Sequence, residues 1–211
     1  MLNTDARQQL RKLLPLEMVA TKQWLLDQGL SLHFLDNAVR SSTLLPLTAG
    51  VYCLLEARVS WQGVVASLQR MSEQPIHVGG LTALELAGLG HYLSKGAEQH
   101  IHLWSEAALP TWLNRVPLNA KFKWHGTRRL WPKMTMDDPR FLNEETWREE
   151  LPPVTFSCPE KAIFETLVDV PKAISFEYAD ELMQGLHNLS PRKLDVLLKN
   201  CNNVNCLDLK K

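Results

Sequence analysis

The chain has 211 residues, 45% of them hydrophobic and 22% charged, which is typical of a globular protein that buries a core. Its 23 Lys and Arg balance its 23 Asp and Glu, so the net charge indicates neither a nucleic-acid nor a membrane partner. The charge is uneven along the chain, because residues 111–136 carry six basic and no acidic side chains, whereas residues 137–189 carry four against twelve.

Hydropathy and cysteine usage favour a cytoplasmic protein. No apolar run approaches the roughly 20 residues that a membrane-spanning helix needs, and the N-terminal residues lack the apolar core of a signal peptide. No CxxC motif and no zinc-site spacing occurs among the cysteines, which are Cys53, Cys158, Cys201 and Cys206. We expect reduced, buried thiols and no cofactor.

Three short helices are predicted near the N-terminus. The first, "DARQQLRKLL", has apolar residues at helical spacing. Thr21 is placed to N-cap the second, "KQWLLDQ", and Gly29 to end it in the left-handed conformation. Ser31 is placed to cap the third, "LHFLDNAVRSS". Two short helices joined by a glycine turn are typical of a helix-turn-helix.

The third helix is expected to have an apolar inner face and a polar outer face. The inward side chains are Leu32, Leu35 and Val39, and the outward ones are His33, Asn37, Arg40 and Ser41. The next segment, "TLLPLTAGVYCLL", predicts a β-hairpin with its turn at Thr48 to Gly50, which would be the wing of a winged helix. The pattern fits equally well three small helices packed on a hairpin with no DNA role.

The character of the chain changes after this hairpin. Ser60 is placed to N-cap "SWQGVVASLQRM", which has an apolar face at helical spacing. We therefore expect a domain boundary between Leu54 and Ser60, with residues 1–56 as the first domain and residues 57–211 as the second.

The glycine-rich segment "HVGGLTALELAGLGHYL" suggests a phosphate-binding loop at first sight. It lacks the spacing of a dinucleotide fingerprint or a P-loop, and no lysine lies near its glycines. Thr82 and Glu85 instead have the spacing of a capping box that opens a helix. We expect the glycines to allow a close approach of other groups or a positive φ.

The basic block combines cations with aromatic residues. "QHIHLW" alternates as a strand, with His100 and His102 on one face; two imidazoles there could bind a metal, but no neighbouring ligands complete a site, so we expect none. "AKFKW" and "RRLW" predict two strands around a turn at Gly126. Their cations and aromatics could form a surface for nucleic acid, although strands with aromatics facing the core and lysines facing water are the favoured interpretation.

The acidic segment "MDDPRFLNEETWREELPP" is expected to be a solvated loop with a short helix. In "SCPEKAIFETL", Ser157 and Glu160 have capping-box spacing with Pro159 in the first turn. "SFEYADELMQGL" and "SPRKLDVLLKNC" predict two more helices. The chain contains no recognisable nucleophile or metalloenzyme motif, so we expect a protein that is not an enzyme.

The segments "GVYCLLEARVSWQGVVASLQ", "HVGGLTALELAGLGHYL" with "IHLWSEAALPTWL", and "FSCPEKAIFETL" through "LSPRKLDVLLKNC" carry a resemblance to a known family. The chain resembles the AbiEi antitoxins of type IV (abortive infection) bacterial toxin–antitoxin systems, over nearly its whole length. The resemblance implies an α+β fold, in which an N-terminal winged helix-turn-helix is followed by a larger mixed α/β antitoxin domain.

The family resemblance also implies two functions. The winged helix would repress its own operon by binding inverted repeats in the promoter, and the second domain would counter a cognate nucleotidyltransferase-like toxin, without a tight complex being required. No membrane partner is implied. The DNA-binding residues would be His33, Asn37, Arg40, Ser41, Ser42, Thr43 and Thr48. The antitoxicity surface would be Lys121, Lys123, Arg128 and Arg129.

Two features differ from the family pattern. Family wings often carry arginines near the "GVY" turn, whereas no charged residue lies between Ser41 and Leu55 here. We also expect a short or divergent C-terminus, because the chain stops at "NCLDLKK" where relatives tend to continue. The uncharged wing favours an alternative function, a protein–protein interaction module with a degenerate winged helix that does not bind DNA.

Overall fold

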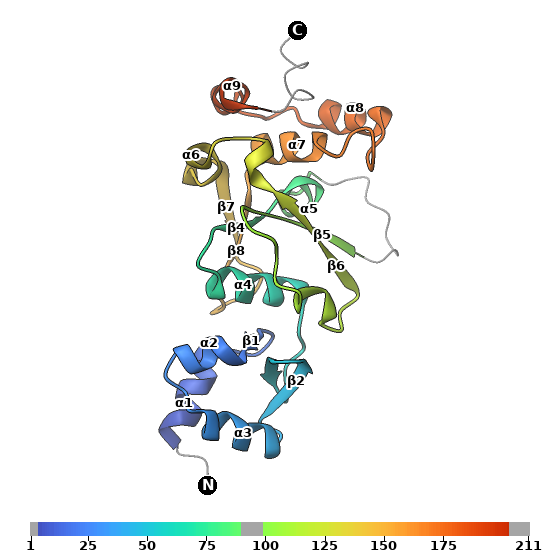
Figure 1. Ribbon diagram of the computed structural model, residues 1–211. Helices are drawn as coiled ribbons and strands as arrows, with labels where there is room; N and C mark the ends of the chain where they lie inside the picture. The colour runs from blue at the N-terminus through green and yellow to red at the C-terminus, as the bar shows by residue number, and fades with distance from the viewer. Residues whose placement is uncertain (1–3, 90–98, 203–211) are drawn as a thin grey trace. The chain divides into compact units, whose positions relative to one another are not determined.

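The computed structural model describes residues 4–89 and 99–202, which form two compact units (Figure 1). The first unit contains Met1–Glu73, Pro110–Ala120 and Thr146–Pro152, and the second contains Gln74–Leu109, Lys121–Glu145 and Pro153–Lys211. The domain boundary between residues 56 and 57 stays a prediction.

The first unit contains four α-helices among the described residues, one 3-10 helix and a small antiparallel sheet (Figure 1). Its helices are α1 (Thr4–Leu13), α2 (Lys22–Asp27), α3 (Leu32–Arg40), α4 (Trp61–Met71) and the 3-10 helix η1 (Leu113–Arg115). Its strands are β1 (Ala20–Thr21), β2 (Leu44–Thr48) and β3 (Val51–Leu54), in the order β1-β3-β2.

Side-chain caps set the helix starts in this unit. Thr21 Oγ1 accepts a hydrogen bond from Trp24 N at 3.2 Å, and Ser31 Oγ accepts one from Phe34 N at 3.1 Å. Gly29 takes a φ of 88° between the two helices, a conformation that costs little only in glycine. These observations confirm the predicted caps and turn, and α2 and α3 with the β2–β3 hairpin form a winged helix-turn-helix.

The buried face of α3 differs from the predicted one. Leu35 is buried as expected, and Phe34 and Ala38 are buried beside it, whereas Val39 is half-buried. The inward placement of Leu32 is wrong, since its side chain is 51% exposed. Because the helix begins at Leu32, this side chain has no preceding helical turn to pack over. The buried face of α3 therefore starts two residues later, at Phe34.

The second unit is built on a five-stranded mixed sheet in the order β6-β5-β4-β8-β7. Strand β4 pairs antiparallel with β5 and parallel with β8, and β8 pairs antiparallel with β7. The strands are β4 (Ile76–Val78), β5 (Gln99–Ser105), β6 (Ala120–Gly126), β7 (Leu142–Glu145) and β8 (Val154–Ser157).

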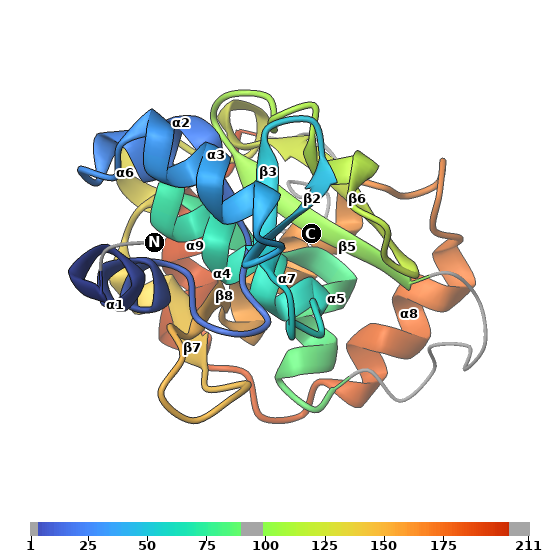
Figure 2. The same ribbon diagram turned by 90° about the horizontal axis from the view of Figure 1, so that it is seen from below.

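Helices α5 and α7 pack against each other and against this sheet (Figure 2). Every residue of α7 except Pro159 is buried, including the polar side chains of Glu160, Lys161, Glu165 and Thr166, and Ile163 and Leu167 are buried as predicted. The helices of this unit are α5 (Gly80–Leu86), α6 (Lys133–Met136), α7 (Pro159–Leu167), α8 (Phe176–Gly185) and α9 (Pro191–Asn200), with 3-10 helices η2 (Thr127–Arg129) and η3 (Pro139–Phe141).

Both predicted capping boxes of this unit are wrong. Helix α5 begins at Gly80 with Gly79 as its N-cap, and Thr82 lies inside it, where its hydroxyl bonds the backbone of β5. Helix α7 has Cys158 as its N-cap, and Ser157 is the last residue of β8, where its hydroxyl donates to Glu165 Oε1 at 3.0 Å. In each case the hydroxyl forms a tertiary hydrogen bond instead of capping the helix.

Glycines in "HVGGLTALELAGLGHYL" allow a close approach of other groups or a positive φ, as expected. A Cβ on Gly79 would lie 2.2 Å from Glu165 Oε2 and 2.4 Å from Trp104 Cδ1. Gly80 and Gly88 have φ values of 56° and 74°, in the left-handed region that favours glycine. Gly90, also in this segment, lies outside the described residues.

The second strand predicted in the basic block is wrong. Strand β6 forms over "AKFKWHG", but "RRLW" continues as η2 and a turn. Leu130 and Trp131 are both almost fully buried, and Trp131 Nε1 donates to the Leu197 carbonyl oxygen at 2.8 Å. Residues 127–129 form the 3-10 helix η2, and Pro132 then leads into α6, so the chain leaves the extended conformation before a second strand can form.

The two sheets and their helices confirm the predicted α+β fold class. Strands β4, β7 and β8 were not predicted, and β7 replaces part of the expected acidic loop. Within residues 4–89 and 99–202, no helix has the length and apolar character needed to cross a bilayer.

Candidate nucleic-acid interface

Helix α3 presents an exposed polar face in the first unit. His33 and Asp36 are exposed and Asn37 is half-exposed. His33 Nε2 and Asn37 Nδ2 are 2.9 Å apart, one helical turn from each other, so the two side chains hold one another in place. Asn37 can therefore offer its amide oxygen, and His33 its other ring nitrogen, to a further partner.

Arg40 ends this face at the last turn of α3. Its side chain is exposed, and within the part of the chain that the structure describes it has no hydrogen-bond or ion-pair partner. A guanidinium offers donors in a planar fork that matches the acceptor edge of guanine or a phosphate. Arg40 is thus the cation of α3 that can make a new contact without losing an old one.

The residues after α3 turn the chain into the wing. Ser42 takes a φ of 57°, and Ser41 Oγ lies 3.0 Å from Thr43 Oγ1 and 3.2 Å from the Ala38 carbonyl oxygen. These hydroxyls already have partners, so they fix the turn first and have only their remaining hydrogen-bonding capacity for a further partner. Thr48 is half-exposed where β2 meets the hairpin turn, at an irregularity in the register.

Two residues of α3 were missed as surface groups by the sequence analysis. Leu32 is exposed at the first turn, where an apolar side chain can contact a thymine methyl group. Asp36 is exposed and its Oδ1 lies 3.4 Å from Lys22 Nζ at the start of α2. This ion pair joins the two helices and lowers the repulsion that a bare carboxylate would exert on a phosphate.

A groove in the first unit supplies cations that the wing lacks. It has a volume of about 770 Å³ and is bordered by α1, by the turn after α3 and by the residues that follow β3. Arg7 and Arg11, one helical turn apart on α1, are exposed along it, opposite Ser42 and Thr43. The sequence analysis missed these two arginines, although the pattern Arg-x-x-x-Arg could have revealed them, since residues four apart share a helix face.

The predicted antitoxicity residues do not all share one element. Lys121 and Lys123 are exposed on β6 with Phe122 buried between them, as the favoured interpretation of the alternation predicted, but the expected burial of Trp124 is wrong, since its side chain is 46% exposed. Arg128 lies on η2, and its Nε donates to Glu106 Oε1 at 2.9 Å. Arg129 is also on η2. The pairing with Glu106 reduces the positive charge that Arg128 adds to this surface.

A polar centre of the second unit resembles a catalytic triad in composition. His77 Nε2 donates to Glu165 Oε1 at 2.8 Å, and Gly80 N donates to Glu165 Oε2 at 2.9 Å. Ser157 also donates to Glu165 rather than to a base, and all three side chains are buried. Burial lowers the pKa of His77. The carboxylate therefore works as a structural acceptor that joins β4, α5, β8 and α7.

Comparisons with known proteins match most of the chain. One family model, described as "Transcriptional regulator, AbiEi antitoxin N-terminal domain", matches residues 4–95. A second, described as "Transcriptional regulator, AbiEi antitoxin, Type IV TA system", matches residues 98–209. The crystal structure of the RV2827C protein from Mycobacterium tuberculosis is similar at 19% identity and a TM-score of 0.44, covering 92% of this chain and 68% of that one. No curated protein sequence matches.

Proposed function

The chain belongs to the AbiEi family, the antitoxin transcriptional regulators of type IV toxin–antitoxin systems, and from this premise we propose that its first unit binds promoter DNA with inverted repeats. The observation that supports this proposal most is the exposed outer face of α3, ending in Arg40. His33, Asn37 and Arg40 contact base edges in the major groove. Ser41 and Ser42 also face the major groove, and Thr43 and Thr48 lie near the DNA backbone.

The test of this interface is the substitution Arg40→Ala. A bidentate arginine–guanine pair contributes about 1–3 kcal/mol, so the variant binds the operator about 5- to 150-fold more weakly in a gel-shift assay. Arg192→Ala is the matched control, because Arg192 is an exposed cation near the start of α9 in the second unit. Equal operator affinity of wild type and Arg40→Ala contradicts the proposal that α3 contacts the bases through Arg40.

Phosphate contacts come from α1 in this proposal rather than from the wing. Arg7 and Arg11 border the groove beside the turn that follows α3. Each phosphate contact contributes about one unit to the slope of log affinity against log salt. The double variant Arg7→Ala/Arg11→Ala therefore lowers that slope by about two while keeping sequence preference. An unchanged slope places the phosphate contacts elsewhere.

The second unit, in our proposal, counters a nucleotidyltransferase-like toxin through the exposed cations Lys121, Lys123 and Arg128 together with Arg129, the next residue of η2. A positive surface can compete with the toxin for a nucleic-acid substrate. Reversal of all four charges to glutamate abolishes the rescue of cells that express the toxin, whereas Lys172→Glu, at another exposed position of the second unit, leaves rescue intact. Full rescue by the quadruple variant contradicts this role.

The uncharged wing favours a second candidate function, a protein–protein interaction module that does not touch DNA. The salt dependence of binding to the upstream promoter fragment separates the two functions. Phosphate contacts release counterions and give a steep slope, and a protein-only module gives no promoter binding at any salt concentration.

A further inference from the structure

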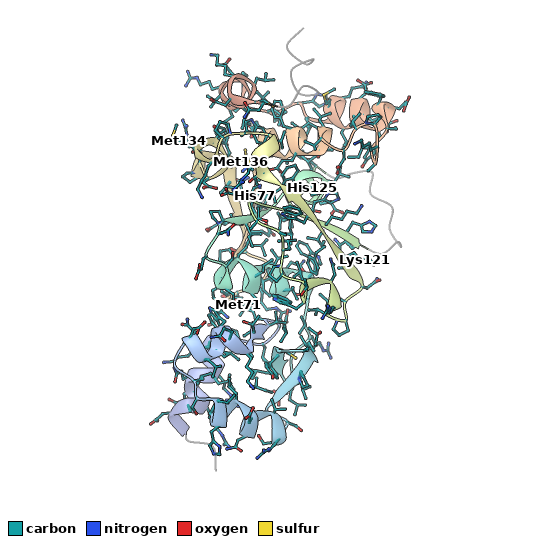
Figure 3. All side chains as sticks on the ribbon, viewed as in Figure 1. Met71, His77, Lys121, His125, Met134 and Met136 are labelled. Atoms are coloured by element: carbon teal, nitrogen blue, oxygen red, sulfur yellow. The ribbon has the colours of Figure 1, made fainter. Side chains whose placement is uncertain are left out.

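Three metal-ligating side chains converge in the second unit from three separate segments. They are His102 on β5, His125 on β6 and Asp169 in the turn that follows α7, and their ligand atoms all lie within 4.8 Å of one another. His102 Nδ1 is 2.9 Å from His125 Nε2 and 3.9 Å from Asp169 Oδ2. Figure 3 labels His125 near the end of β6 opposite to Lys121.

The fold holds the two imidazoles in a defined orientation. Strands β5 and β6 are neighbours in the sheet. The ring of His125 stacks on Trp104 at a centroid distance of 4.7 Å and on His102 at 5.0 Å. The backbone of His102 is fixed by a hydrogen bond to Thr82 Oγ1 at 3.1 Å. Ligands held in this way lose little conformational freedom when an ion binds.

We propose that His102 Nδ1, His125 Nε2 and the carboxylate of Asp169 form a three-ligand site for a divalent transition metal, with Zn²⁺ as the best match. Imidazole nitrogen selects zinc and its neighbours over Mg²⁺ and Ca²⁺. Zinc–nitrogen bonds of about 2.0–2.1 Å place two tetrahedral ligands about 3.4 Å apart. The ion therefore replaces the 2.9 Å hydrogen bond between the two imidazoles, which open by about 0.5 Å, and the Asp169 carboxylate, 3.9 Å from His102 Nδ1, closes by about as much.

The surroundings leave one coordination position open. His102 is buried, whereas His125 and Asp169 are half-buried, so a fourth ligand can reach the ion from solvent or from a partner. The positive charge of Lys123 repels a cation at this position, and the negative charge of the buried Glu165 carboxylate offsets that repulsion. The bound ion links β5, β6 and the turn after α7, at the end of β6 that carries His125.

The experiment titrates the full chain, without a histidine tag and freed of metal by a chelator, with Zn²⁺ in a calorimeter. We expect one ion per chain and a melting temperature raised by roughly 5–10 °C when free zinc is about a hundred times its Kd. His125→Gln and Asp169→Asn each weaken zinc binding at least about tenfold. His100→Gln is the matched control, since His100 is an exposed histidine two residues from His102 on the same strand.

Cobalt distinguishes this site from one made by the cysteines. Co²⁺ bound by nitrogen and oxygen gives visible absorption without the near-ultraviolet charge-transfer band of a cobalt–thiolate bond, so the wild-type chain is informative even if a variant fails to fold. No stoichiometric binding at micromolar zinc overturns the proposal. A thiolate band, or zinc binding unchanged in both His125→Gln and Asp169→Asn, overturns it as well.

Discussion

Gly63 shows how one residue can set the packing of a whole helix. It lies in the first turn of α4, and a Cβ built on it would be 2.0 Å from the Glu17 carbonyl oxygen and 2.9 Å from the Glu17 carbonyl carbon. Glu17 itself has a φ of 73°, so its backbone is already in an uncommon conformation. Helix α4 can approach this backbone only because residue 63 has no side chain.

Gly63→Ala is therefore expected to destabilise the first unit. Because the obstructing atoms belong to the backbone, they cannot rotate away, and overpacking of this kind costs about 1–3 kcal/mol or more. Urea unfolding measures the loss. Gly185→Ala is the control, since Gly185 also lies in a helix, α8, but a Cβ there meets nothing within 4 Å. That variant is neutral or stabilised by up to about 1 kcal/mol, and equal losses in both variants contradict the packing argument.

Polar residues show where local sequence patterns mislead. Thr82 and Ser157 both have an acidic residue three positions later, which is the pattern of a capping box. Their hydroxyls instead bond the backbone of β5 and the carboxylate of Glu165. These partners are distant in the sequence or enclosed in the core, so a pattern of four residues cannot reveal them.

At the scale of elements, the predictable features are those with local causes. The caps Ser31, Ser60 and Ser190 and the hairpin turn at Gly50 follow from side chains that bond within a few residues, and the structure confirms them. Strand β4 has three residues, and β7 and β8 have four each. Such short strands form because neighbouring strands pair with them, and their own periodicity is too brief to detect.

The wing has the shape of a DNA-binding element without its usual charge. Its turn exposes Ala49 between Thr48 and Gly50. We expect Ala49→Arg to bind promoter DNA more tightly and to steepen the salt slope by about 0.9, since one added cation releases one more condensed counterion. Ala49→Glu should weaken binding, because it places a negative charge beside the phosphates.

Fluorescence anisotropy with labelled promoter DNA over a range of salt concentrations measures both wing variants. The pair is informative because the two substitutions put opposite charges at one position. If the affinity of Ala49→Arg and Ala49→Glu is the same as that of wild type, the wing does not approach the duplex, and the phosphate contacts belong to α1 alone.

At the scale of the whole molecule, the buried charges depend on contacts that join distant segments. His77 and Glu165 are 88 residues apart in the sequence, and His125 meets His102 and Asp169 from a different strand and a different turn. The exposed face of α3 was predictable because it follows one helix. These internal clusters were not, since the order of the strands decides which side chains meet.

The burial of His77 makes the stability of the chain depend on pH. Burial lowers its pKa, the charge of Lys161 acts in the same direction, and Glu165 and Asp137 oppose them. The folded state therefore binds fewer protons than the unfolded state once the pH falls below about 6.5, the ordinary pKa of histidine. The free energy of unfolding should decrease as the pH falls from about 6.5, at up to about 1.4 kcal/mol per pH unit from this group.

His77→Gln isolates this effect, because glutamine can still donate a hydrogen bond to Glu165 but does not titrate. Urea unfolding of both proteins between about pH 7 and pH 5, with a chelator present, gives the two pH profiles. The pKa of Glu165 is lowered in the wild-type chain mainly by His77, and in the variant Lys161 and the Gly80 N–H still lower it, while the other buried histidines contribute equally to both proteins. The variant should have the flatter profile, whereas parallel profiles would mean that His77 keeps its proton affinity in the folded state, with the charge of Glu165 outweighing the burial.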